Sequence, residues 1–214
     1  MIFVSDKAPN IFNWSKKTSR KILHILIGNL TLILPFYTHQ IFPLFVAIPF
    51  IPITFFACPY SPIPNLRSKL VMLQDKTEIG HPLGLVFYSF SFSILTALFF
   101  HVPYVVAAGI LPMAYGDSFA ALVGERYGKR RFNIFSSWKS VEGSLSVFAL
   151  SFLSVFLGLA FYSLFYTFSI VEVLVSSLSV ALIALVVEAV SPKGTDNLFV
   201  PFACAAFMYL TRAL

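Results

Sequence analysis

The sequence predicts an all-α integral membrane protein with about seven transmembrane helices and a cytoplasmic N-terminus. Of the 214 residues, 58% are hydrophobic and only 11% are charged, whereas a soluble domain usually carries about 25% charged residues. The hydrophobic residues form long runs, and between Lys21 and Arg67 there is no Asp, Glu, Lys or Arg. Lys and Arg gather in the short segments between such runs, as they do in membrane proteins. Residues 1–214 are therefore interpreted as a single polytopic membrane domain.

The expected helices follow from the length of the uncharged runs and from their breaks. A spanning helix needs roughly 20 apolar residues, so the run after Lys21 holds two helices, separated near residues 37–40. Prolines break the polar segment 59–82, and His101 with Pro103 divides the next uncharged run. The seven helices are expected at about 22–38, 41–58, 83–100, 104–123, 143–163, 171–190 and 197–213.

The charge of the loops predicts the orientation. All 15 Lys and Arg residues except Arg212 fall in the N-terminal segment, in the loops 59–82, 124–142 and 191–196, or at the adjoining helix ends. Positively charged loops remain in the cytoplasm, so these segments are expected there, and the turns near 39, 102 and 167 are expected on the outside. Since the net charge of +6 arises from such loops, we predict no nucleic-acid partner.

The acidic residues gather on the same side, and Asp117 lies deepest among them. It falls about two helical turns before the loop 124–142. An ionisable residue inside a span is costly and by default marks a function. Asp117, Gly124 and Gly128 have the spacing of one helical face, and Lys129, Arg130 and Lys139 follow.

An acid, close glycines and a cluster of cations are the groups that a magnesium–nucleotide site needs. The loop at about 124–142 is therefore a candidate nucleotide-binding loop. The alternative is structural, with small residues packing two helices and lysines that only set the orientation. Spacing alone favours neither interpretation.

Weaker candidates lie elsewhere on the predicted cytoplasmic side. His24 shares a helical face with Arg20 and Gly28 and is either a proton acceptor or a packed histidine, with the second favoured. Glu78 lies in the loop before the third helix and is either a functional acid or a solvated one. Asp196 is either a second metal ligand or the N-cap of the last helix.

Taken together, these motifs resemble the polyprenol kinase family of dolichol, phytol and farnesol kinases, which is related to the CDP-diacylglycerol synthases. The most specific part of the resemblance is Gly116–Gly128 with its Gly-Asp-Ser-Phe-Ala-Ala-Leu-Val-Gly sequence, followed by Lys139-Ser-Val-Glu-Gly143. The other matching pieces, in family order, are Arg20-Lys21, His24, Gly28, Glu78, Gly84, Tyr88, Glu188, Asp196-Asn197 and Pro201.

The resemblance implies a membrane enzyme that transfers a phosphoryl group from CTP to the hydroxyl of an isoprenoid alcohol, with Mg²⁺ as cofactor. It implies that Asp117 coordinates Mg²⁺ and that Asp196 and Asn197 form a second metal or phosphate contact. The triphosphate would lie on Gly124, Gly128, Lys129 and Arg130, and Lys139 with Glu142 would complete the nucleotide loop. Glu78 or His24 would accept the proton of the alcohol.

Two alternatives stay open at this point. The first is a phosphatidate or archaeal-lipid cytidylyltransferase, although residues 191–197 lack the His-Gly-Gly pattern of those enzymes. The second is a transporter or scaffold without catalysis, which the scarcity of charge in the outer half disfavours. Without a recognisable signal or transit peptide, a prokaryotic plasma membrane is the default location, and a plastid membrane is the alternative.

Overall fold

The computed structural model describes residues 16–70, 73, 82–134, 137–192 and 194–213. The helical elements are α2 Lys16–Gly28, η1 Asn29–Phe36 (a 3₁₀ helix), α3 Ile41–Ala57, α4 Pro64–Lys69, α6 Gly84–Phe99, α7 Pro103–Leu111, η2 Pro112–Asp117 (a π-helix), α8 Ser118–Tyr127, α9 Val141–Tyr162, α10 Ile170–Val190 and α11 Asp196–Ala213. Two short antiparallel strands, β1 Arg131–Ile134 and β2 Ser137–Ser140, form a hairpin.

The prediction of an all-α fold is confirmed, and each of the seven expected segments is helical. Among the described residues, three helices are long and apolar enough to cross a membrane, namely Pro103–Tyr127, Val141–Tyr162 and Ile170–Val190. Shorter apolar helices are Ile41–Ala57 and Gly84–Phe99. These helices define a helical membrane protein, whereas the count of seven spans and the cytoplasmic N-terminus stay predictions.

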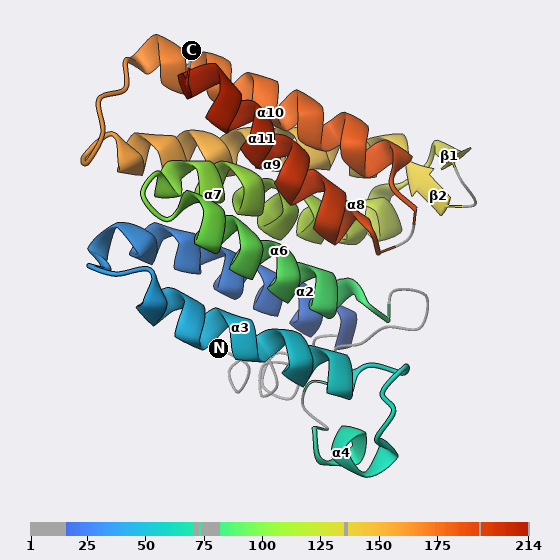
Figure 1. The fold of residues 1–214 in the computed structure, drawn as a ribbon. Helices are drawn as coiled ribbons and strands as arrows, with labels where there is room; N and C mark the ends of the chain where they lie inside the picture. Colours follow the sequence, from blue (N-terminus) through green and yellow to red (C-terminus); the bar gives the residue numbers. More distant parts are fainter. Residues whose placement is uncertain (1–15, 71–72, 74–81, 135–136, 193, 214) are drawn as a thin grey trace.

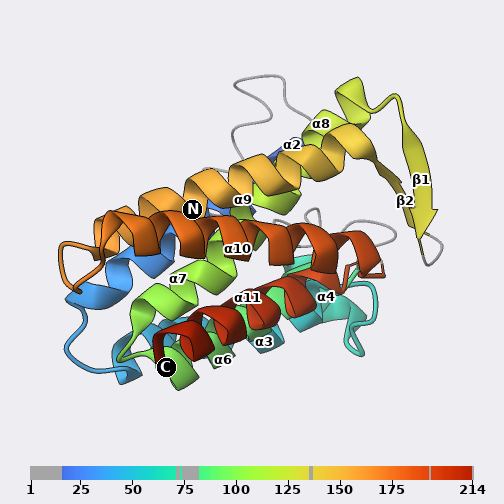
Figure 2. The same ribbon diagram turned by 90° about the horizontal axis from the view of Figure 1, so that it is seen from above.

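Helix α7 is the centre of the bundle. Every residue from Pro103 to Leu111 is buried, because α6, α9, α11 and η1 all pack around this helix. Figure 1 shows α7 between the layer of α9, α10 and α11 and the layer of α2, α3 and α6, and Figure 2 shows the same bundle from above.

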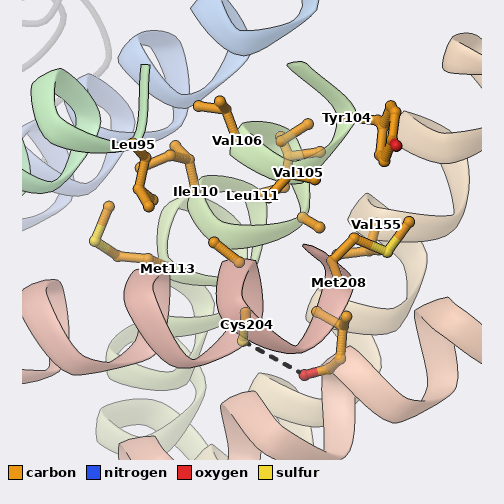
Figure 3. Packing of buried hydrophobic residues seen from close by; sticks show 14 of the residues in the cluster. Leu95, Tyr104, Val105, Val106, Ile110, Leu111, Met113, Val155, Cys204 and Met208 are labelled. Atoms are coloured by element: carbon orange, nitrogen blue, oxygen red, sulfur yellow. Dashed lines mark hydrogen bonds between the residues drawn. The ribbon is translucent and has the colours of Figure 1, made fainter. Parts of the chain in front are cut away.

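Close helix packing in this core depends on small residues, as is common in membrane proteins. At Gly109 of α7, an added Cβ would lie 2.6 Å from the backbone oxygen of Pro201 in α11. The buried cluster of the core includes Leu95, Val105, Ile110 and Met208 (Figure 3). The Cys204 thiol also donates a hydrogen bond to the Val180 carbonyl, with 3.7 Å between sulfur and oxygen.

The fourth predicted helix is continuous over Pro103–Tyr127, but it is not a regular α-helix. Its middle turn, Pro112–Asp117, is a π-helix. Proline has no N–H to donate to the helix, and a π turn places an extra residue in the turn, which rotates all later side chains. Asp117 is the last residue of this turn, and the regular helix α8 begins at Ser118.

Part of the loop predicted at 124–142 is ordered secondary structure. Helix α8 continues to Tyr127, and β1 then pairs with β2 in the register Arg131 to Ser140 and Phe132 to Lys139. The hairpin lies beyond the ends of α8 and α9 (Figures 1 and 2). We call this end of the bundle the hairpin end.

Substitution of Gly109, with Gly158 as a control, tests the importance of the α7–α11 contact. Gly109→Ala is expected to lower the free energy of unfolding by about 1–3 kcal/mol, because the new methyl meets backbone. Gly158→Ala in α9 is the matched control, since its methyl would meet only a side-chain methyl of Leu111 at 2.6 Å, and alanine favours a helix by roughly 1 kcal/mol. Thermal unfolding in detergent measures both variants, and an equal loss in the two would contradict this interpretation of the core.

Candidate active site

A polar cavity of ≈ 410 Å³ lies at the hairpin end. Residues far apart in the sequence build it, because α8, the hairpin and the facing ends of α9, α10 and α11 converge there. Its lining includes the carboxylates Asp117, Glu125, Glu188 and Asp196 and the cations Arg131 and Lys139. The structure thus brings together Asp117, Gly124, Lys139 and Asp196, four of the residues that the sequence analysis selected.

Asp117 is held by a lysine from another helix. Nζ of Lys21 in α2 lies 2.5 Å from Oδ2 of Asp117. The lysine side chain is only 4% exposed and the aspartate side chain 17% exposed. The hydroxyl of Ser118 also donates to the Lys21 carbonyl, at 3.3 Å. An ion pair in such surroundings compensates two charges that would be expensive to bury singly.

Lys139 makes the second ion pair of the cavity. Its Nζ lies 2.7 Å from Oε1 of Glu188 and also donates a hydrogen bond to the Glu188 carbonyl. Lys139 belongs to β2 and Glu188 to the last turn of α10, so this pair attaches the hairpin to the bundle. The other carboxylate oxygen of Glu188, Oε2, is buried without a hydrogen-bond partner.

Asp196 is the third carboxylate of the cavity and the first residue of α11. Its Oδ1 accepts a hydrogen bond from the N–H of Asn197 at 2.9 Å. This contact lies within the first turn of α11. Since Lys21 is paired with Asp117 and Lys139 with Glu188, neither lysine is the ion-pair partner of Asp196.

The donor set fits a magnesium ion that is bound together with a ligand. Among the described residues, no three His, Cys, Asp or Glu side chains form a ready metal centre. Mg²⁺, however, is usually held by one or two carboxylates plus substrate phosphates, not by an all-protein cage. Asp117 and Asp196, which line the same cavity, supply two carboxylates of this kind.

Glu142 acts on the backbone of the turn between α8 and the hairpin. Its Oε2 accepts a hydrogen bond from the N–H of Lys129 at 3.1 Å, and both carboxylate oxygens lie 3.4 Å from the N–H of Arg130. The side chains of Lys129 and Arg130 are exposed and do not line the cavity. Glu142 therefore holds the turn in place, while the two basic side chains remain at the surface.

Gly124 and Gly128 lie against the same side chain, because a Cβ added at either glycine would meet Oγ of Ser140, at 3.0 Å and 2.8 Å. Helix α8 ends at Tyr127, and Gly128 is its extended C-cap, with φ −67° and ψ 98°. Gly124 faces Gly143 of α9, because a Cβ added at Gly124 would lie 3.8 Å from the Gly143 Cα. Both line the cavity, so they pack α8 on α9 and also keep the wall of the cavity open.

Asn197 and His24, two further predicted site residues, do not line the cavity. The amide of Asn197 donates to the Gly84 carbonyl at 3.2 Å, so this residue joins α11 to α6. His24 is buried in α2, one turn beyond Lys21. Glu78 lies outside the described residues.

Sequence reasoning missed Trp138 of the cavity wall and the role of Lys21 behind it. Trp138 is 69% exposed and lines the cavity beside Arg131. The available signal was an exposed aromatic residue next to Lys139, in a segment interpreted as a loop. The sequence analysis treated Lys21 as an orientation signal and as a residue that matches the family. It did not identify Lys21 as the partner of Asp117.

The fold and the site together define a class of protein. It is a helical membrane protein with a cavity of carboxylates and cations at one end of the bundle, the kind of site that binds an anionic ligand with a metal ion.

Comparison with known proteins gives the family. The chain is 35% identical over 198 residues to a phytol kinase of Synechocystis sp., covering 88% of this chain and 77% of the relative. It is 31% identical over 190 residues to an uncharacterized protein of Methanocaldococcus jannaschii, covering 87% of this chain and 89% of the relative. A probable chloroplastic phytol kinase 2 of Glycine max is 31% identical over 201 residues, which covers 91% of this chain and 65% of that protein.

The chain belongs to the phytol kinase family, and the predicted resemblance is confirmed. No family model matches the chain, and no solved structure matches it.

The buried Lys21–Asp117 pair leads to a stability prediction. Lys21→Met leaves a carboxylate without its cation, and removal of one partner from a buried pair costs up to about 3–5 kcal/mol. Lys21→Met combined with Asp117→Leu is expected to recover most of that loss, because no charge is then left unpaired. Thermal unfolding in detergent gives the double-mutant cycle.

The ion pair at the opposite end of the bundle is the control. Arg212 lies 2.8 Å from Glu172, which is 47% exposed, so Glu172→Gln is expected to cost at most about 1 kcal/mol. A loss for Lys21→Met no larger than this would show that the Lys21–Asp117 pair is not structurally important.

Proposed function

We propose that the protein is a lipid-alcohol kinase that transfers the γ-phosphoryl group of CTP to the hydroxyl of an isoprenoid alcohol, such as phytol, farnesol, geranylgeraniol or a polyprenol. The observation that carries the proposal is the convergence of Asp117, Asp196 and Lys139 on one polar cavity. Family membership supports the same activity, since the relatives in Synechocystis and soybean are named phytol kinases.

The proposed reaction makes one bond and breaks one bond. The alcohol oxygen attacks the γ-phosphorus, the new C–O–P link forms, and the bond from that phosphorus to the bridging oxygen breaks, releasing CDP. Negative charge is spread over the transferring group and the leaving oxygen, so catalysis depends on positioning and on electrostatic stabilisation. The hydroxyl proton passes to a protein acceptor, for which His24 and Glu78 are the candidates.

Residues that line the cavity, or that hold those residues in place, each have a proposed role in this reaction. Mg²⁺, held by Asp117 and Asp196 when bound, would neutralise charge on the β- and γ-phosphates. Lys21 holds the Asp117 carboxylate in place through the 2.5 Å contact. Lys139 and Arg131 at the wall supply positive charge toward phosphate oxygens. Glu142 holds the turn that presents the basic residues 129–131, through the backbone N–H groups of Lys129 and Arg130.

The same proposal places the reaction at the cytoplasmic face of the membrane, by default a prokaryotic plasma membrane. Support comes from the loop charges, because the basic segments flank the hairpin end and cytoplasmic loops carry the excess of Lys and Arg. The nucleotide would then bind from the cytoplasm and the alcohol from the bilayer.

A product assay tests the proposal. Purified protein is incubated with Mg²⁺, an isoprenoid alcohol and, in turn, CTP, ATP, UTP or GTP. The expected products are the alcohol monophosphate and the nucleoside diphosphate, with CTP as the best donor. Pyrophosphate release from a phosphatidate-type substrate would instead indicate cytidylyl transfer, and no turnover of any of these substrates would contradict the proposal.

Substitution of Asp117 tests the role of the cavity. Asp117→Asn is expected to lower kcat/KM by roughly 10²–10³, since loss of one charge-stabilising group has an effect of this size. Glu172→Gln, a matched acid-to-amide change at the opposite end of the bundle, is expected to leave kcat/KM unchanged. Full activity of a folded Asp117→Asn variant would remove Asp117 from the catalytic site.

Trp138 is proposed to contact the nucleotide base, because an exposed aromatic ring on the wall of a polar cavity is suited to stacking. Stacking of a base on an aromatic side chain contributes about 1–3 kcal/mol. Trp138→Ala is therefore expected to raise the KM for the nucleotide by roughly 5- to 100-fold without changing the KM for the alcohol, and Trp138→Phe should keep most of the affinity. Equal KM values for wild type and Trp138→Ala would refute this contact.

A further inference from the structure

A second cavity, apolar and separate from the first, lies within the bundle. It measures ≈ 480 Å³, within the range of about 300–1,000 Å³ typical of small-molecule sites, and lies between the α2–η1 segment, α3 and α6. Its lining residues are mostly aliphatic or aromatic, and they are Ile27, Leu30, Ile33, Leu34, Tyr37, Pro43, Val46, Ala47, Phe50, Tyr88, Ser89 and Phe92.

The shape of the fold explains why this space exists. Helix α3 packs mainly on α6 and lies at the edge of the bundle in Figure 1. Only residues 37–40 connect η1 to α3, yet the two elements diverge and leave the cavity between them. Ile33 and Val46 on its walls are 44% and 55% exposed, so the cavity is accessible from the lipid-facing surface.

The cavity is about as long as half of a bilayer's hydrocarbon thickness. On the α2–η1 wall its lining runs from Ile27 to Tyr37, and the ten helical steps between these two residues rise about 15–20 Å. Half the hydrocarbon thickness is about 15 Å. A single extended apolar chain therefore fits this space better than a compact ligand does.

One end of the apolar cavity is lined by Tyr88. Tyr88 contacts His24, which lies between this cavity and the polar site. The hydroxyl of Tyr88 donates to the His24 carbonyl at 2.8 Å, and the two rings lie 4.7 Å apart. His24 is 1% exposed, and neither of its ring nitrogens has a hydrogen-bond partner. Buried polar atoms of this kind are rare. One turn before His24 in α2 is Lys21, which pairs with Asp117.

We infer that the apolar cavity between η1, α3 and α6 binds the hydrocarbon tail of the acceptor alcohol, with the hydroxyl directed toward His24. This inference rests on the proposed function, which supplies the class of ligand. The arrangement is continuous from the cavity to Tyr88, His24, Lys21 and Asp117. A tail in the cavity therefore directs its head toward the site of phosphoryl transfer, and His24 gains a hydrogen-bond partner.

The cavity selects among alcohols by shape. Lipid tails are as apolar as the walls, so burial alone provides little driving force inside a membrane. Fit to the walls then discriminates between tails, and a difference of one methylene in such a pocket changes specificity roughly 10- to 200-fold.

A bulky residue in the cavity tests the inference. Ala47 of α3 is 9% exposed and lines the cavity, so Ala47→Phe shortens the space. We expect it to raise the KM for geranylgeraniol at least roughly tenfold and to change the KM for the shorter farnesol much less, with nucleotide KM unaltered. Ile48→Phe is the matched control, because Ile48 is the next residue, is 51% exposed and does not line the cavity.

A binding measurement separates the inference from the proposed function. A geranylgeraniol analogue with a diazirine near the end of its tail is photolysed with the wild-type protein in nanodiscs, and labelled peptides are identified by mass spectrometry. Labels are expected on 27–37, 43–50 and 88–92, and Ala47→Phe should abolish them while Ile48→Phe retains them. If thermal unfolding shows that Ala47→Phe is not folded, Val46→Trp is used in its place, because Val46 is a half-exposed residue of the cavity wall.

Each outcome tests either the tail-binding site or the proposed kinase activity. Turnover with labelling outside the cavity, or with labelling unaffected by the folded variants, overturns the tail site and leaves the kinase proposal intact. Labelling of the cavity without turnover supports the site as an isoprenoid-binding cavity and refutes the kinase.

Discussion

The structure depends on the neutralisation of charge at one end of an otherwise apolar bundle. The side chains of Lys21 and Asp117 are 4% and 17% exposed and lie 2.5 Å apart, although they are 96 residues apart in the sequence. Lys139 and Glu188 form a similar pair between the hairpin and α10. Each pair joins segments that no local interaction would bring together, so the charges that form the cavity also determine how α2, α8, α10 and the hairpin meet.

The rest of the bundle positions this cavity. The buried α7 continues through the π turn at Pro112–Asp117 into α8, so the helix at the centre of the core also carries the key carboxylate. Packing at Gly109 and at the Gly124–Gly143 contact brings α9 and α11 close enough for their ends to reach the same cavity. In this fold, the packing of the core and the geometry of the proposed site are set by the same helices.

Much of the site was predictable, because burial of charge is unusual enough in a membrane protein to be visible in the sequence. Asp117 stood out as an acid within a long apolar segment, Lys139 as part of the cluster of cations that follows it, and Asp196 as a possible second metal ligand. Helical spacing placed Gly124 and Gly128 on one side, and both lie against Ser140 although α8 ends at Tyr127. Trp138 was missed because the hairpin has only four residues in each strand, too few for a clear alternation of apolar and polar residues.

The sequence by itself determined the helical membrane class, the positions of seven apolar helical segments and the family, because these depend on hydropathy and on short motifs. Tertiary structure alone decided which charges are paired, that Asn197 contacts Gly84 instead of the cavity, and that α3 diverges from η1 to leave an apolar cavity. The physical reason is that a local pattern specifies the type of each element. The partner of a buried charge and the shape of a cavity depend on how separate elements pack.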